Sequence, residues 1–325
     1  MGNPFSRGGY VSLRGHSQVH AVRFLPNGSF VTAGDTSLRL WHAETGKSEK
    51  VWKFASSVET CCCSPDGKYI ACGVLDGVIF VFEMRSRQQL AVWQAHSECG
   101  QGPLLQFFAD STYLLSAAGA TCKIWCARTS KLINTWDTTS ITSLNIASNC
   151  TMLAVGSNNG IVTIHNLPDG NATRRVHAHR GEVWGVAFAP ESASLATASR
   201  DDPDGVKVWA TGSWELVQVL RGHVGTVFDL GFSSDGLHLV TCGLDKTLRV
   251  WSCHCSASDI PNSWRCDNVL VGHNDAIMSC AFSPSSSGKD IVVSGARDGS
   301  ARAWRLADVP QFNAADAAAY GLPFS

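Results

Sequence analysis

The sequence has no excess of charge of either sign. It contains 26 lysines and arginines against 27 aspartates and glutamates, which leaves a net charge of -1. Balanced charge without a basic stripe argues against a nucleic-acid partner and against electrostatic attachment to a membrane. No segment approaches the roughly 20 apolar residues of a membrane-spanning helix, and the N-terminus lacks the basic and apolar regions of a secretory signal. We therefore expect a soluble protein of the cytoplasm or the nucleus.

Sequence motifs of catalysis are also missing. There is no glycine-rich loop to cradle a phosphate, no paired set of metal-ligating residues and no Gly-x-Ser-x-Gly turn around a nucleophile. We expect no enzymatic activity and no cofactor. The 13 cysteines are odd in number, and Cys61, Cys62 and Cys63 are consecutive within an apolar run. This usage is typical of buried thiols in a reducing compartment.

What the sequence does contain is a repeat of short alternating runs. Seven of these runs end on equivalent positions, at Trp41, Phe82, Trp125, His165, Trp209, Trp251 and Trp304. Their successive spacings are 41, 43, 40, 44, 42 and 53 residues. A period near 40 with several short strands is the spacing of propeller blades, because a single unit cannot bury its own apolar faces.

Each unit contains further strand and turn signals. An upstream run reads V-x-x-V-x-F, for example at 183–188 and 227–232, and we interpret it as an alternating strand. Tight turns follow it at Asn27-Gly28, Asp66-Gly67 and Asp235-Gly236. A second turn carries an acidic or amide residue six positions before the strand end, at Asp35, Asp76, Asn159, Asp245 and Asp298. The pattern predicts an all-β, seven-bladed β-propeller with four-stranded antiparallel blades.

This pattern resembles the WD-repeat (tryptophan-aspartate repeat) family from about Tyr10 to Leu306. At the places of the Gly-His pair typical of that family stand Gly15-His16, Ala95-His96, Ala178-His179, Gly222-His223 and Gly272-His273. The chain departs from the family pattern because no strand-end Trp is followed by Asp. We predict a flexible arm over residues 1–9, the propeller over 10–306 and a tail over 307–325.

The two ends of the repeat region predict how the ring closes. Tyr10 to Arg14 precedes the first Gly-His pair as a fourth strand should, whereas the last unit stops at its third strand near Arg305. We expect the N-terminal strand to complete the last blade, which would satisfy an otherwise open edge.

The resemblance implies a buried hydrogen-bond relay, in which an Asp orients a His that reaches a Ser or Thr and then the Trp. Two units hold every member, namely His223, Thr241, Asp245 and Trp251 in the sixth and His273, Ser294, Asp298 and Trp304 in the seventh. The fifth unit offers His179, Thr197, Asp201 and Trp209. The first unit has an altered hydroxyl spacing, the third lacks the Asp, and the second and fourth lack the His.

The resemblance also points to one rim of the ring as the place where partners bind. Six residues of blades five to seven occupy those positions: Trp184, Arg200, Phe228, Leu244, Met278 and Arg297. Aromatic, Met and Arg side chains dominate protein-interface hot spots. An alternative is that Trp184 and Phe228 only pack the mouth of the channel. His20, Glu59 and Thr142 hold equivalent places on other blades and are more polar.

These observations favour a non-catalytic scaffold or adaptor that binds other proteins or peptides within a multiprotein complex. The alternative is a hydrolase with an active site at the propeller channel, since each relay resembles a Ser-His-Asp set. Because blades five to seven carry the fuller relays, we predict that they form the stiffer sector and the binding face.

Two further motifs have simpler interpretations. Cys253, His254, Cys255 and Cys266 could ligate a metal, but their spacing lacks the two paired sets of a zinc site, so a surface loop with incidental thiols is favoured. The start Met-Gly-Asn-Pro-Phe-Ser matches the N-myristoylation pattern at Gly2. The alternative is an ordinary flexible arm, and contact with a membrane is expected only if Gly2 is acylated.

Overall fold

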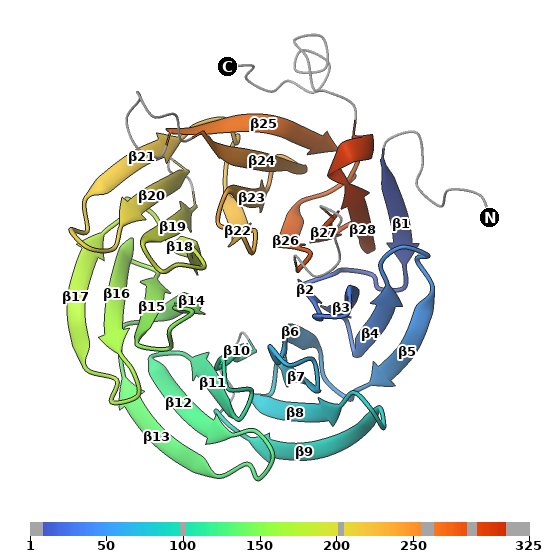
Figure 1. Ribbon diagram of the computed structural model, residues 1–325. Coiled ribbons are helices and arrows are strands. Elements are labelled where there is room, and N and C mark those ends of the chain that lie inside the picture. Colours follow the sequence, from blue (N-terminus) through green and yellow to red (C-terminus); the bar gives the residue numbers. More distant parts are fainter. Residues whose placement is uncertain (1–8, 98–101, 201–204, 255–262, 285–290, 310–325) are drawn as a thin grey trace.

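Seven β-sheets surround a central channel in the computed structural model (Figure 1). The structure describes residues 9–97, 102–200, 205–254, 263–284 and 291–309. Within these residues every sheet has four antiparallel strands, and the innermost strand of each sheet faces the channel. The predicted seven-bladed propeller is confirmed.

The strands follow one another from the channel outward in each blade. Blade 1 comprises β2 (Ala21–Phe24), β3 (Ser29–Gly34), β4 (Ser37–His42) and β5 (Ser48–Lys53). Blade 2 comprises β6 (Val58–Cys63), β7 (Tyr69–Val74), β8 (Val78–Glu83) and β9 (Gln88–Gln94). Blade 3 comprises β10 (Leu104–Phe107), β11 (Tyr113–Ala118), β12 (Thr121–Cys126) and β13 (Leu132–Asp137). Blade 4 comprises β14 (Ile141–Ile146), β15 (Met152–Ser157), β16 (Ile161–Asn166) and β17 (Ala172–His177).

The remaining blades repeat this order. Blade 5 comprises β18 (Val183–Phe188), β19 (Ser194–Ser199), β20 (Val206–Ala210) and β21 (Leu216–Leu220). Blade 6 comprises β22 (Val227–Phe232), β23 (His238–Gly243), β24 (Thr247–His254) and β25 (Ser263–Val271). Blade 7 comprises β26 (Ile277–Phe282), β27 (Ile291–Ala296), β28 (Ser300–Arg305) and β1 (Tyr10–Arg14), and the short 3-10 helix η2 (Leu306–Asp308) follows β28.

The ring is closed by β1, which forms the outer strand of blade 7 beside β28 (Figure 1). The register pairs Tyr10 with Trp304 and Leu13 with Ala301. The ring of Tyr10 lies 4.6 Å from that of Trp304, and the Arg302 guanidinium lies 4.3 Å from the centre of the Tyr10 ring. The predicted closure by the N-terminal strand is therefore confirmed, and an aromatic and cation-π contact reinforces it.

The hydrophobic core lies between neighbouring blades and not inside any one of them. Between blades 6 and 7, for example, Val240 and Leu248 pack with Ile277 and Val292, and all four side chains are buried. A sheet with two apolar faces can bury both faces only if another sheet packs on each side. The seven blades therefore stabilise one another as a ring.

A close contact recurs beside the His of blades 1, 6 and 7. An arginine of the third strand crosses the glycine that precedes the His, and a Cβ atom on Gly15 would lie 2.7 Å from Cζ of Arg39. The same contact recurs at Gly222 with Arg249 and at Gly272 with Arg302. An alanine at these positions would collide with the guanidinium.

In blades 3 and 5 a lysine takes the place of this arginine, and an alanine takes the place of the glycine. Lys123 Nζ donates to the carbonyl oxygen of Ala95 at 2.6 Å, and Lys207 Nζ donates to that of Ala178 at 2.9 Å. The narrower lysine leaves room for the alanine methyl group. The residue before each His therefore matches the cation beside it in all five blades.

Candidate functional site

Blades 6 and 7 contain the relay with all four members joined. In blade 6, His223 Nδ1 lies 2.9 Å from Asp245 Oδ2 and its Nε2 lies 2.7 Å from Thr241 Oγ1, to which Trp251 Nε1 donates at 2.9 Å. In blade 7, His273 Nδ1 lies 3.1 Å from Asp298 Oδ2 and its Nε2 lies 2.8 Å from Ser294 Oγ. Trp304 Nε1 donates to the same Ser294 hydroxyl at 2.9 Å.

Three other blades hold the His, the hydroxyl and the Trp of the relay. In blade 5, His179 Nε2 lies 2.8 Å from Thr197 Oγ1, which accepts from Trp209 Nε1 at 3.0 Å, while Asp201 lies outside the described residues. The matching sets are His96, Ser116 and Trp125 in blade 3 and His16, Thr32 and Trp41 in blade 1. In blade 1, Asp35 Oδ2 lies 3.9 Å from His16 Nδ1, and the Asp35 carboxylate instead accepts hydrogen bonds from Ser17. The His-hydroxyl-Trp core is thus present in all five blades in which the sequence has a Gly-His or Ala-His pair.

Blade 4 uses a different bond between the same regions. His165 stands at the strand-end position of the Trp, and its Nε2 lies 2.9 Å from Oγ1 of Thr138, which comes from the loop that supplies the His in other blades. Its Nδ1 lies 2.8 Å from the carbonyl oxygen of Gly170. The histidine thus takes the place of the Trp, and its hydroxyl partner takes the place of the His. Sequence matching to the Gly-His pair could not detect this exchanged relay.

Burial and charge set the ionisation of these groups. Burial, together with nearby Lys123, lowers the pKa of His96 to about 4, and burial with nearby Arg39 lowers that of His16 to about 4. Burial would raise the pKa of Asp245, but the interaction with His223 and the hydrogen bonds that Asp245 accepts outweigh it and lower this pKa to about 2. Asp245 therefore remains a carboxylate that accepts hydrogen bonds at neutral pH.

The relay hydroxyls are unsuited to nucleophilic catalysis. Thr32, Ser116, Thr197, Thr241 and Ser294 are each 0% exposed. Each of these oxygens already accepts from a Trp and lies next to a His, so no substrate atom could approach it. The Ser-His-Asp likeness of the sequence describes a structural network inside the blade.

The predicted partner-binding residues share one backbone feature. Trp184, Phe228 and Met278 are each the extra residue of a β-bulge near the start of the innermost strand. Glu59 and Thr142 occupy the same bulge in blades 2 and 4. A bulged residue is released from the regular alternation of the ladder, so its side chain can be displayed at the channel mouth without altering the core.

On blades 5 to 7 these residues form a row across two blade junctions. The rings of Trp184 and Phe228 meet edge to face with their centres 5.9 Å apart, and the guanidinium of Arg297 lies 5.7 Å from the centre of the Phe228 ring. These three residues and Met278 line the channel, which encloses about 1000 Å³. Four of the six predicted residues therefore come together at one place.

The other two predicted residues, Arg200 and Leu244, are not among the residues that line the channel. Arg200 Nη1 lies 3.5 Å from Glu182 Oε2, which also accepts from Trp184 Nε1 at 3.0 Å. Leu244 is 46% exposed. Arg200 is thus joined to the row through Glu182, whereas Leu244 is an exposed apolar residue of blade 6 that is not part of the row.

The other side of the mouth is polar. His20 Nδ1 lies 3.1 Å from Glu59 Oε2, and both side chains are about three-quarters buried. The hydrogen bond with Glu59 raises the pKa of His20, and the same bond lowers the pKa of Glu59. The mouth is therefore asymmetric, with a His-Glu pair on one side and an aromatic and arginine row on the other.

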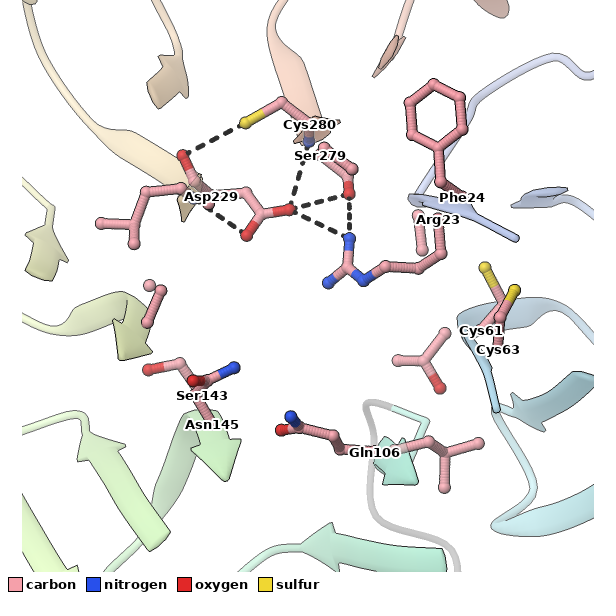
Figure 2. A pocket seen from close by; sticks show the side chains of 18 of the residues that line it. Arg23, Phe24, Cys61, Cys63, Gln106, Ser143, Asn145, Asp229, Ser279 and Cys280 are labelled. Carbon is pink, nitrogen blue, oxygen red and sulfur yellow. Dashed lines mark hydrogen bonds and ion pairs between the residues drawn. The ribbon is translucent and has the colours of Figure 1, made fainter. Parts of the chain in front are cut away.

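Deeper in the channel, a polar network joins blades 6, 7 and 1 (Figure 2). Arg23 Nη1 donates to Ser279 Oγ at 2.9 Å and lies 3.3 Å from Asp229 Oδ2. Ser279 Oγ donates to the same carboxylate oxygen at 2.8 Å, which also accepts from the backbone N-H of Cys280 at 3.2 Å. The sequence analysis missed these residues, although Arg23 and Asp229 are charged residues within otherwise apolar strands.

Similar bonds recur around the channel wall. Gln106 Oε1 accepts from the backbone N-H of Ile146 at 2.8 Å, and Asn145 Oδ1 accepts from that of Phe188 at 2.9 Å. An innermost strand has one unpaired edge, whose N-H groups need acceptors. Side chains of the preceding blade supply these acceptors at four junctions, namely those of blades 3 and 4, 4 and 5, 6 and 7, and 7 and 1.

Comparison with known proteins assigns this architecture. The family model described as WD domain, G-beta repeat matches residues 10–42, 46–83, 170–202, 214–252 and 264–305, which is more than half of the chain. The chain belongs to the WD40 family. Residues between 83 and 170 lie outside the matched segments, yet they form β9 to β16 and complete the WD40 ring. That stretch contains the blade without an Asp and the blade with the exchanged His.

Similar proteins include both long and partial matches. The guanine nucleotide-binding protein subunit beta of Oryza sativa subsp. japonica is 25% identical over 314 residues, which covers 74% of this chain and 82% of that protein. Apoptotic protease-activating factor 1 of Homo sapiens is 25% identical over 301 residues, which covers 77% of this chain and 23% of that protein. Autophagy-related protein 16 of Arabidopsis thaliana is 31% identical over 132 residues, which covers 41% of this chain and 24% of that protein. The WD40 chain thus matches most of the first protein and a minor part of the other two.

The remaining sequence motifs lie partly outside the described structure. Gly2 and Cys255 are outside it, so neither lipidation nor the complete Cys and His set can be placed. Cys253 and Cys266 pack at the core between blades 5 and 6. In the described part of this WD40 chain no group of His, Cys, Asp and Glu could hold a metal, and no helix is long and apolar enough to cross a membrane.

The cysteines agree only in part with the predicted buried thiols, since six of those described are buried and five are partly exposed. Eleven of them lie in the described residues, and all eleven are free thiols. Burial raises the pKa of Cys61 to about 12. Such a thiol stays protonated and packs as a small apolar group.

Proposed function

We propose that this WD40 protein is a non-catalytic scaffold that presents the channel mouth of blades 5 to 7 to a partner protein within a larger complex. The observation that carries the proposal is the row of Trp184, Phe228 and Arg297, in which the two aromatic residues stand at β-bulges of neighbouring blades. These residue types contribute most to interface hot spots, and here they are displayed together.

The names of the similar proteins support this proposal in general terms. They describe a subunit of a guanine nucleotide-binding protein and a factor that activates a protease. The geometry disfavours the hydrolase alternative. The relay hydroxyls are enclosed, and Ser279 on the channel wall already donates to Asp229 and accepts from Arg23.

The proposal can be tested by affinity isolation from the native cell followed by mass spectrometry. The variant Trp184→Ala, Phe228→Ala, Arg297→Ala should lose partners that the wild type retains. The control His20→Ala, Glu59→Ala, Thr142→Ala changes the equivalent positions on blades 1, 2 and 4 and should keep them. An unchanged set of partners from the first variant, shown to be folded by its urea transition, would reject the binding face.

A further inference from the structure

Arginines stand at equivalent positions of blades 5 and 7, but their surroundings differ. The backbone N-H of Arg200 donates to the carbonyl oxygen of Glu182 at 3.0 Å, and that of Arg297 donates to the carbonyl oxygen of Ala276 at 2.9 Å. In blade 5 the side chain at this bridge is a glutamate, which pairs with the arginine at 3.5 Å. In blade 7 it is an alanine, and no carboxylate among the described residues pairs with Arg297.

The exposed guanidinium of Arg297 is nevertheless held in place. It lies over the ring of Phe228 in the neighbouring blade, 5.7 Å from the ring centre. Stacking on an aromatic face orients the planar group and leaves its N-H donors at the edges, where they can form two parallel bonds to a carboxylate. A positive group that is oriented but lacks a counterion is complementary to an acidic ligand.

The surface beside Arg297 indicates which kind of side chain a ligand should carry next to its acidic residue. Phe228 and Trp184 continue the row away from the guanidinium, and Met278 lines the channel on the blade of Arg297. Trp184, Phe228 and Met278 are only partly buried, so each still offers apolar area to a ligand. Burying an apolar side chain here would remove that area from water.

We infer that the partner segment bound by blades 5 to 7 is an acidic peptide, in which an Asp or Glu pairs with Arg297 and a neighbouring apolar side chain packs on Phe228, Trp184 and Met278. This inference rests on the proposed function, since it gives the chemistry of the partner at the same site. Arg200 is the matched internal control, because Glu182 already pairs with it.

A phage library of random linear peptides tests the inference directly, because the selection itself supplies the ligand. The full chain is immobilised, and the selected peptides are sequenced. Wild type should enrich peptides with Asp or Glu next to an aromatic or aliphatic residue. Arg297→Ala should lose the acidic preference, Arg297→Glu should select Lys or Arg instead, and Arg200→Ala should select as the wild type does.

A selected acidic peptide then gives a quantitative measure by fluorescence polarisation. Loss of a charge-assisted pair should weaken binding to Arg297→Ala by about tenfold or more. The Arg200→Ala control should change binding by less than about threefold, as expected for an arginine already paired at the surface.

The outcomes separate this inference from the proposed function. Peptides that require Trp184 and Phe228 but show no acidic preference would overturn the inference and leave the function standing. Equal selection by wild type and Arg297→Ala would do the same. If wild type enriches no peptide that depends on this row, both the function and the inference fail.

Discussion

Substituting Gly15 by alanine tests the match between the residue before each His and the cation beside it. Gly15 has no left-handed backbone angle, so alanine suits its backbone, but the new Cβ would lie 2.7 Å from Arg39 Cζ, 2.8 Å from Nη1 and 2.9 Å from Nε. These separations are well below van der Waals contact. Displacing the guanidinium should cost about 1–3 kcal/mol, which the reduced entropy of the unfolded chain offsets by about 0.4–1 kcal/mol. We expect Gly15→Ala to be destabilised by about 1–2 kcal/mol.

The rescue is Arg39→Lys. In blades 3 and 5 a lysine coexists with alanine, and Lys123 Nζ reaches the Ala95 carbonyl oxygen at 2.6 Å. The double variant Gly15→Ala, Arg39→Lys should therefore be more stable than the two single changes would predict, by about 1 kcal/mol or more. The measurement is urea unfolding of all four proteins, compared at equal slope.

The reciprocal cycle in blade 3 supplies the control. Lys123→Arg alone should destabilise the protein, and adding Ala95→Gly should remove most of that loss. Coupling energies within about 0.3 kcal/mol of zero in both cycles would show that the sites are independent. The steric account of the Gly-His and Ala-His pairs would then be wrong.

Three further changes address other parts of the ring, each followed by urea unfolding. Thr241→Val should lower the free energy of unfolding by about 2–4 kcal/mol, because the ring nitrogen of His223 and the indole N-H of Trp251 both lose their hydroxyl partner. The control Thr163→Val removes a buried hydroxyl that has no partner among the described residues, so it should be neutral or stabilising, and equal losses would contradict this. Stability should fall as the pH decreases from 6.5 towards 4, because the lowered pKa of His96 in the folded protein means that the unfolded chain takes up the proton first. His96→Gln should reduce this fall by up to about 3 kcal/mol, and an unchanged dependence of stability on pH would refute the reasoning. Tyr10→Ala should lose about 2 kcal/mol of closure contacts, while Tyr10→Phe keeps the ring and should stay within about 0.5 kcal/mol of wild type.

The repeat was predictable because it is local and recurs. The strand-end positions, the turns and the Gly-His pairs each mark one place in a blade, so their spacing indicated seven blades and the closure by β1. The V-x-x-V-x-F run suggests simple alternation, yet Val183 and Val186 are three residues apart. The bulge at Trp184 explains that spacing, because it adds one residue to the strand.

The channel network could not be predicted because it depends on long-range contacts. Arg23 and Asp229 are separated by 206 residues and meet only after the ring has closed. The exchanged relay of blade 4 was missed for a related reason. Thr138 and His165 each look ordinary in sequence, and their geometry in the folded blade reveals the bond.

The pairing of β1 with β28 has a consequence for synthesis. The ribosome makes Tyr10 early and its partner Trp304 only after almost all of the propeller. Six blades can form from neighbouring segments, but the seventh must wait for two distant parts of the chain to meet. Contacts of such high sequence separation form slowly. The completed ring should therefore appear only after translation has passed β28, and its last step joins the earliest strand to the latest.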